Sequence, residues 1–132
     1  MDRNKKLFLK KYTSFALAII GLSTSAALPA LAANRYSYIS YDPFTKAYGV
    51  VRHYPSFELA EATATNKCRE SGSRNCQMAA WSRNACTALA VSPEGPWGGS
   101  WGRSVFSADR GALNACYNDG GRHCRVVLRT CE

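Results

Sequence analysis

The chain has 132 residues, with 17 Lys or Arg, 9 Asp or Glu, and a formal net charge of +8. This length indicates one domain and excludes a multidomain arrangement within the chain. The positive charge leaves an anionic partner open but identifies none, because net charge first governs solubility and non-specific binding.

The first 32 residues predict a signal peptide. A cationic stretch, MDRNKKLFLKK, precedes the apolar run FALAIIGLSTSAALPALA, and Ala30 and Ala32 form the small-residue pattern that signal peptidase reads. We expect cleavage after Ala32, with Ala33 as the alternative, because the most apolar core, 15–22, is short for a membrane span of about 20 residues. The first cysteine is Cys68, so the cleavage point carries no cysteine for a lipid anchor. An exported protein, periplasmic or extracellular, without a stable membrane anchor is therefore predicted.

The expected mature chain, residues 33–132, is a single small domain that remains basic. Removing the five basic residues and Asp2 of the leader leaves 12 basic and 8 acidic residues, a net charge of +4. Ten of the 12 are arginines, which favour bidentate contacts to phosphate or carboxylate. An anionic partner and a merely solvated basic face both fit this composition, and no specific nucleic acid is expected.

An internal repeat organises the mature chain. Cys68 and Cys76 are eight residues apart, as are Cys116 and Cys124, and 48 positions separate the two pairs. The same offset relates four further pairs: Ser56 and Ser104, Ala60 and Ala108, Ala64 and Ala112, Asn66 and Asn114. Self-similarity at a fixed offset indicates a duplicated structural unit.

The first copy, about residues 35–86, begins with a strand at 35–41, RYSYISY, and a return strand at 47–53, AYGVVRH. A helix is expected from Ser56 to Cys68, because its small and apolar residues recur on one face. Ser56 is the expected N-cap. The segments CQMAAW and ACTALAV, which follow, are predicted to be two strands of a hairpin joined by SRN.

The second copy, about residues 87–131, opens with the stretch SPEGPWGGSWGRS at 92–104, whose glycines and prolines indicate a loop. Its later half is compatible with a strand. A helix at about 107–116 and a last strand at 124–131 complete the copy. The predicted fold is α+β: a disulfide-stapled, mainly antiparallel sheet with two helices, in duplicated strand–strand–helix–strand units.

The six cysteines predict a disulfide framework, as is usual in short exported chains. Symmetry between the copies favours the pairs Cys68–Cys76, Cys116–Cys124 and Cys86–Cys131, the last of which is expected to join the two halves. A metal site is the alternative, but structural zinc sites place two to four residues between paired cysteines, and here there are seven. No metal and no cofactor are expected.

The two histidines, His53 and His123, are the residues from which an enzyme would be built. A histidine pair with a nearby cation fits general acid–base cleavage of a phosphodiester. The sequence has no Ser-His-Asp arrangement, no HExxH and no phosphate-binding glycine loop. We therefore assign no catalytic residue.

Two groups of residues are candidates for binding. Trp97 and Trp101 bracket GGS and form either a stacking platform for a sugar, an aromatic ring or a peptide, or part of the core. Arg69, Arg74 and Arg122 lie on the two cysteine loops, where a two-fold relation would bring them into one basic rim.

The residues also carry a resemblance. AYG at 47–49, the alanine-rich helices that end in cysteine, NACTALA at 84–90 and ALNAC at 112–116 resemble the bacterial exported family Domain of Unknown Function 4189. The likeness covers about residues 36–131, and its usual tryptophan–glycine appears here as Tyr48–Gly49. It implies a small secreted or periplasmic disulfide-bonded domain, with no established catalytic site to transfer.

Together these observations predict an exported, non-catalytic binding or interaction module, as an effector, an inhibitor or an envelope ligand-binder. Its partner is expected to be a protein or an anionic or glycan ligand. The alternatives are a small secreted hydrolase or nuclease that uses His53 and His123, and a structural protein of the envelope.

Overall fold

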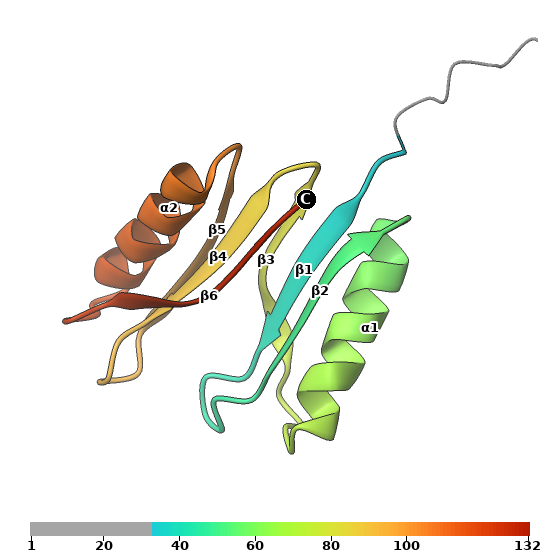
Figure 1. Cartoon of the computed structure of the whole chain (residues 1–132). Coiled ribbons are helices and arrows are strands. Elements are labelled where there is room, and N and C mark those ends of the chain that lie inside the picture. The colour runs from blue at the N-terminus through green and yellow to red at the C-terminus, as the bar shows by residue number, and fades with distance from the viewer. Residues whose placement is uncertain (1–32) are drawn as a thin grey trace, which may run out of the picture. The chain divides into compact units, whose positions relative to one another are not determined.

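The computed structural model describes residues 33–132, and the predicted signal peptide at 1–32 lies outside the described residues (Figure 1). The described part contains strands β1 (Tyr36–Tyr41), β2 (Tyr48–Tyr54), β3 (Gln77–Arg83), β4 (Cys86–Val91), β5 (Trp97–Gly102) and β6 (Arg125–Cys131), and helices α1 (Phe57–Glu70) and α2 (Val105–Asn118). The predicted α+β class and the repeated strand–strand–helix–strand units are confirmed.

The strands form two antiparallel sheets of three strands, in the orders β2-β1-β3 and β5-β4-β6. The predicted hairpin between CQMAAW and ACTALAV is therefore wrong, because β3 pairs with β1 and β4 opens the other sheet. Asn84, which has a positive φ of 52°, lies where the chain crosses from β3 in the first sheet to β4 in the second. Its side-chain oxygen accepts a hydrogen bond from the backbone N–H of Arg35 at 2.8 Å, which ties the crossing to the start of β1.

The two sheets face each other, and each helix covers the outer face of one sheet, which gives four layers (Figure 1). Ile39, Tyr41 and Leu89 are buried between the sheets. Ala60 and Ala64 of α1 pack under Tyr38 of β1. The second helix buries its own small residues, Ala108, Ala112 and Cys116, against β4. Small side chains at these positions let each helix approach its sheet closely.

Both helices begin at a serine, as capping chemistry favours. Ser56 accepts from the backbone N–H of Leu59 at 3.2 Å, and Ser104 accepts from that of Ser107 at 3.2 Å. The second helix therefore starts two residues earlier than the alanine spacing predicts. Ser107 completes a capping box by accepting from the N–H of Ser104 at 3.1 Å.

The duplication extends to an irregularity in the strand register. In the first sheet Ile39 pairs with Ala80 and Ser40 with Met78, so Ala79 is bulged out of the register. In the second sheet Leu89 pairs with Leu128 and Ala90 with Val126, so Val127 is bulged in the same way. The two bulged residues are 48 positions apart, the offset that relates the cysteines. Bulges of this kind are kept as structural features, so the halves share more than their cysteine spacing.

Three disulfides are present among the described residues, and they join the same pairs that the spacing predicts: Cys68–Cys76, Cys116–Cys124 and Cys86–Cys131. The first two connect the end of a helix to the following strand. The third does not join the halves as expected, because Cys86 and Cys131 are register partners in one sheet. Tyr36 and Arg83 occupy the equivalent places in the first sheet. Beyond the chain connection at 84–85, the halves are therefore held together by packing between their sheets and not by one of these disulfides.

The loop that carries the first disulfide is anchored through the buried Asp42, which follows β1. The carboxylate of Asp42 accepts hydrogen bonds from the hydroxyl of Ser73, from the N–H of Phe44 at 2.8 Å and from the hydroxyl of Thr45 at 2.9 Å. The Ser73 hydrogen bond, more than the others, holds the pKa of Asp42 below its ordinary value. This single side chain ties the β1–β2 turn to the cysteine loop.

We therefore expect Asp42→Asn to flatten the pH dependence of stability. A depressed pKa in the folded state means that the stabilisation is present above the ordinary aspartate pKa and is lost as pH falls through the folded value. Urea unfolding of both proteins from neutral to acidic pH tests this. The free energy of unfolding should fall more on acidification in the native protein than in the variant, and parallel profiles would contradict the expectation.

Candidate functional site

The two sheets leave edge strands side by side at each flank of the molecule. On one flank β3 lies next to β5, and on the other β2 lies next to β6. Each of these four strands pairs with only one neighbouring strand in the described part of the chain. An edge strand presents unpaired N–H and C=O groups, so these flanks are the places where another chain can add to the sheets.

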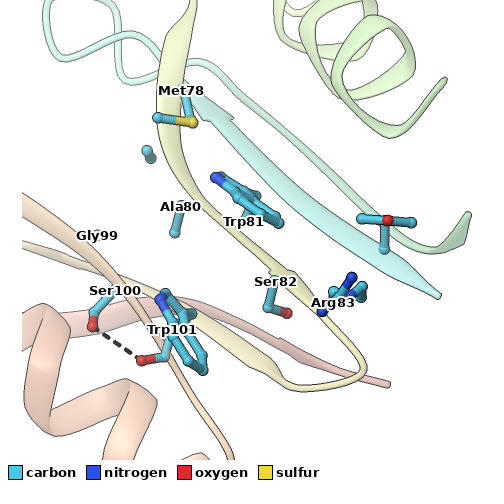
Figure 2. Close-up of a pocket in the computed structure, with 10 residues that line it drawn as sticks. Met78, Ala80, Trp81, Ser82, Arg83, Gly99, Ser100 and Trp101 are labelled. Atoms are coloured by element: carbon cyan, nitrogen blue, oxygen red, sulfur yellow. Dashed lines mark hydrogen bonds between the residues drawn. The ribbon is translucent and has the colours of Figure 1, made fainter. Parts of the chain in front are cut away.

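A groove of about 570 Å³ runs between β3 and β5, and we call it the tryptophan groove (Figure 2). Its lining comes mostly from apolar and aromatic side chains, with one cation and no carboxylate: Tyr36, Met78, Ala79, Ala80, Trp81, Ser82, Arg83, Gly99, Ser100 and Trp101. A concave apolar surface with a few polar groups is the usual character of a ligand site.

The two tryptophans of this groove are exposed although they are large and apolar. Trp81 of β3 is 40% exposed and Trp101 of β5 is 60% exposed (Figure 2). Trp81 is held in place by Tyr36, with ring centroids 6.5 Å apart, and by Phe57, at 5.1 Å in an edge-on arrangement. A ring that is fixed by its neighbours and open on another side offers contact area at little cost in side-chain entropy.

The predicted pair of Trp97 and Trp101 is not brought together in one site. Trp97 is half-buried, and its ring meets the edge of Tyr41 at 5.7 Å in the layer between the sheets. Trp101 lines the groove instead, with Trp81 on the neighbouring strand. Sequence analysis did not single out Trp81, and the only signal for it was an aromatic residue in a strand, which more often marks the core.

The three arginines predicted for a basic rim lie outside the tryptophan groove. Arg69, Arg74 and Arg122 are all exposed, and none of them lines it. Arg69 lies in the last turn of α1 and not on a loop as predicted, whereas Arg74 and Arg122 lie on the loops that follow α1 and α2. The basic rim that the two-fold relation suggested stays a prediction.

The two histidines lie at opposite ends of β6. The Nδ1 atom of His53 is 2.7 Å from the carboxylate of Glu132, which follows this strand. His123 precedes the strand, is largely exposed, and its Nδ1 atom is 3.8 Å from Glu94. The length of β6 separates the two imidazoles by about 20 Å at the usual rise per residue. This arrangement does not place both rings on one scissile bond.

The buried titratable groups have structural partners. Burial, and then the nearby Glu61, raise the pKa of Tyr38 to about 12, so its hydroxyl stays protonated and donates to Glu61 at 3.3 Å.

Within residues 33–132, no group of three or more His, Cys, Asp or Glu is placed to hold a metal ion. No helix in this range is long and apolar enough to cross a membrane.

The opposite flank is equivalent in position and different in chemistry. Gly49 of β2 and Gly98 of β5 both abut the covering helix, and counting along the strands from these glycines makes Arg52 the counterpart of Trp101, at the bulge where β2 has one residue more than β5. The common bulge makes Arg129 of β6 the counterpart of Trp81. These arginines line a groove of about 390 Å³ between β2 and β6. Two exposed tryptophans on one flank thus correspond to two arginines on the other.

Fold and groove together define a small α+β domain with three disulfides, built from two equivalent units whose free edges have diverged. The chain belongs to the family described as Domain of unknown function (DUF4189), whose model matches residues 36–131. Comparison with curated proteins and with solved structures finds no match.

Proposed function

We propose that this protein is an exported, non-catalytic binding module that holds its ligand in the tryptophan groove between β3 and β5. Export is supported by the signal-peptide pattern of the first 32 residues and by the three disulfides, since oxidised cysteines persist outside the cytoplasm. The role of effector, inhibitor or envelope ligand-binder depends on the identity of the ligand.

One observation carries the proposal: the two flanks are equivalent in fold, yet only the β3/β5 flank exposes tryptophan, whereas the β2/β6 flank exposes the smaller apolar surfaces of Tyr48 and Val127. A requirement of the fold would act on both flanks alike, because the strand order and the bulges of β3 and β6 recur in both halves, and only β2 has an additional bulge, next to Arg52. The fold alone therefore does not account for the exposure of Trp81 and Trp101, whereas a ligand that covers both rings would. Tryptophan is also enriched, together with tyrosine and arginine, among the residues that dominate binding energy.

The hydrolase alternative is less well supported, because His53 and His123 lie at opposite ends of β6 and each is close to a different carboxylate. A structural role in the envelope would leave the tryptophans without a ligand. Under either alternative, substitutions in the tryptophan groove would not change what the protein binds or how tightly it binds. Binding measurements on groove variants therefore separate both alternatives from the proposal.

Arrays of immobilised peptides and of cell-wall oligosaccharides, probed with the purified oxidised protein, test the proposal. We expect saturable binding to members of one array, and a loss of at least about 30-fold in affinity for Trp101→Ala, as for a residue that dominates an interface. Arg52→Ala, at the equivalent position of the other flank, is the matched control and should bind like the native protein.

Two results would count against the proposal. The first is binding that is unchanged in Trp101→Ala and Trp81→Ala while Arg52→Ala loses it. The second is turnover of RNA or of a cell-wall polymer that disappears in His53→Ala or His123→Ala, since this would establish the hydrolase.

A further inference from the structure

The tryptophan groove lies along the edge of β3, which pairs with no further strand within residues 33–132, although Gly99 of β5 packs against the carbonyl group of Ala79 at the bulge. In the part of the chain that the structure describes, β3 pairs with β1 alone, and no other backbone hydrogen bond involves Met78 to Arg83. All six of these residues line the groove, whereas only three residues of β5 do. The unpaired backbone N–H and C=O groups of β3 therefore form the longest polar feature of the tryptophan groove.

Proteins usually protect such edges with charged side chains, prolines or a covering segment. The equivalent flank follows this rule. Strand β6 carries the exposed Arg125 and Arg129, and the carboxylate of Glu132 accepts hydrogen bonds from the backbone N–H of His53, at 2.9 and 3.0 Å. The guanidinium of Arg129 is paired with the carboxylate of Asp109 on α2, and Arg52 adds a further cation, on β2. On that flank, charge and capping disfavour the addition of another strand.

Strand β3 has the same bulge as β6 but lacks the charges that protect the other flank. From Gln77 to Ser82 it has no charged residue and no proline, and only Arg83 at its end carries a charge. Met78 is 51% exposed and, like Trp81, projects an apolar surface from the strand. Because the two edges are equivalent in fold, the contrast marks the β3 edge as the one that is kept available for pairing.

The lining also constrains the chemistry of the occupant. A strand added to β3 would satisfy its unpaired N–H and C=O groups, and its own alternate side chains would meet the apolar surfaces of Met78, Trp81 and Trp101. Arg83 is the only charged residue of the lining, so a carboxylate at the corresponding end of the added strand would be paired.

We propose that the ligand of the tryptophan groove is an extended peptide segment of a partner protein, which adds to β3 as a fourth strand of the first sheet. Its alternate residues are apolar, and an acidic residue lies at the end that meets Arg83. This inference rests on the proposed function, since it names the ligand class of the same site.

A displayed library of random heptapeptides, selected on the purified oxidised protein, supplies the probe. We expect enrichment of peptides with alternating apolar residues and an acidic residue toward one end. The selected peptide is then synthesised in two N-methylated forms, each blocking alternate backbone N–H groups. One form should bind at least about tenfold more weakly, because it removes the donors that face β3, while the other keeps its affinity.

The variants Arg83→Ala and Arg125→Ala provide the matched pair for charge. Arg83→Ala should lower the affinity for the acidic peptide at least about threefold and leave the affinity for its acid-to-amide analogue unchanged. Arg125→Ala, on the protected flank, should change neither affinity.

The outcomes separate this inference from the function on which it rests. Equal affinity of both N-methylated forms, or binding of oligosaccharides alone with loss in Trp101→Ala, would overturn strand addition and leave the binding module intact. Concentration-dependent dimers that Met78→Lys abolishes, without peptide binding, would replace the peptide by a second copy of the chain. Absence of any ligand that Trp101→Ala weakens would overturn both.

Discussion

Replacing Gly99 with alanine is expected to destabilise the protein by about 3 kcal/mol, at the upper end of the usual cost of overpacking. A Cβ at Gly99 would lie 1.9 Å from the carbonyl oxygen of Ala79 and 3.2 Å from the Cβ of Ala80, both on β3. The first contact is with backbone, so no rotamer change relieves it. The two edge strands would have to separate, which would disturb the layer between the sheets.

Urea unfolding of the oxidised protein measures this effect, with Ser100→Ala as the control. Ser100 is the next residue of β5 and points to the opposite face, toward Gly111 of α2. Its substitution removes one hydroxyl and should change the free energy of unfolding little. Similar stability of the two variants would mean that β3 and β5 do not pack as closely as described. Because both strands form the tryptophan groove, Gly99→Ala is also expected to weaken ligand binding.

Removing the Cys86–Cys131 disulfide is expected to cost more than removing either of the other two. The bond closes a separation of 45 residues, whereas Cys68–Cys76 and Cys116–Cys124 each close one of 8. In the chain-entropy model a loop of the larger size contributes about 4 kcal/mol and one of the smaller size about 2.5 kcal/mol, because the longer loop restricts the unfolded chain more.

The double variants Cys86→Ala/Cys131→Ala and Cys68→Ala/Cys76→Ala test this expectation, since they remove the same atoms and differ in loop size. Chemical unfolding should give the lower free energy for the first. A larger loss in the second would show instead that the anchoring of α1 outweighs the entropy of the unfolded chain. In either case the Cys86–Cys131 variant should keep the packing between the halves, because this bond lies within one sheet.

The parts of the fold that were predictable from sequence are those that depend on residues close together in the chain. The recurrence of Ala60, Ala64 and Cys68 on one face indicated the first helix, and all three are buried. The eight-residue spacing of the paired cysteines indicated a short loop between a helix and a strand. Both signals are local, because helical periodicity and small loops involve few intervening residues.

The candidate site was only partly predictable. Trp101 was identified, because tryptophan beside glycines at a segment boundary is unusual. Trp81 was not, and Trp97 was grouped with the wrong neighbour. Whether a strand residue faces the core or solvent depends on what covers that face, and period-2 alternation does not say which layer lies above it. At Trp97 the covering ring is Tyr41, which is more than 50 residues away in the chain.

By itself, the sequence determined the helices, the duplication, the family and the cysteine pairs, because spacing along the chain encodes all of these. Only the tertiary structure decided that the strands form two facing sheets, that Cys86–Cys131 closes within one of them, and that two equivalent edges carry tryptophan on one flank and arginine on the other. Strand partners are chosen by hydrogen bonding and burial between distant segments, so their arrangement becomes visible only when the layers are assembled.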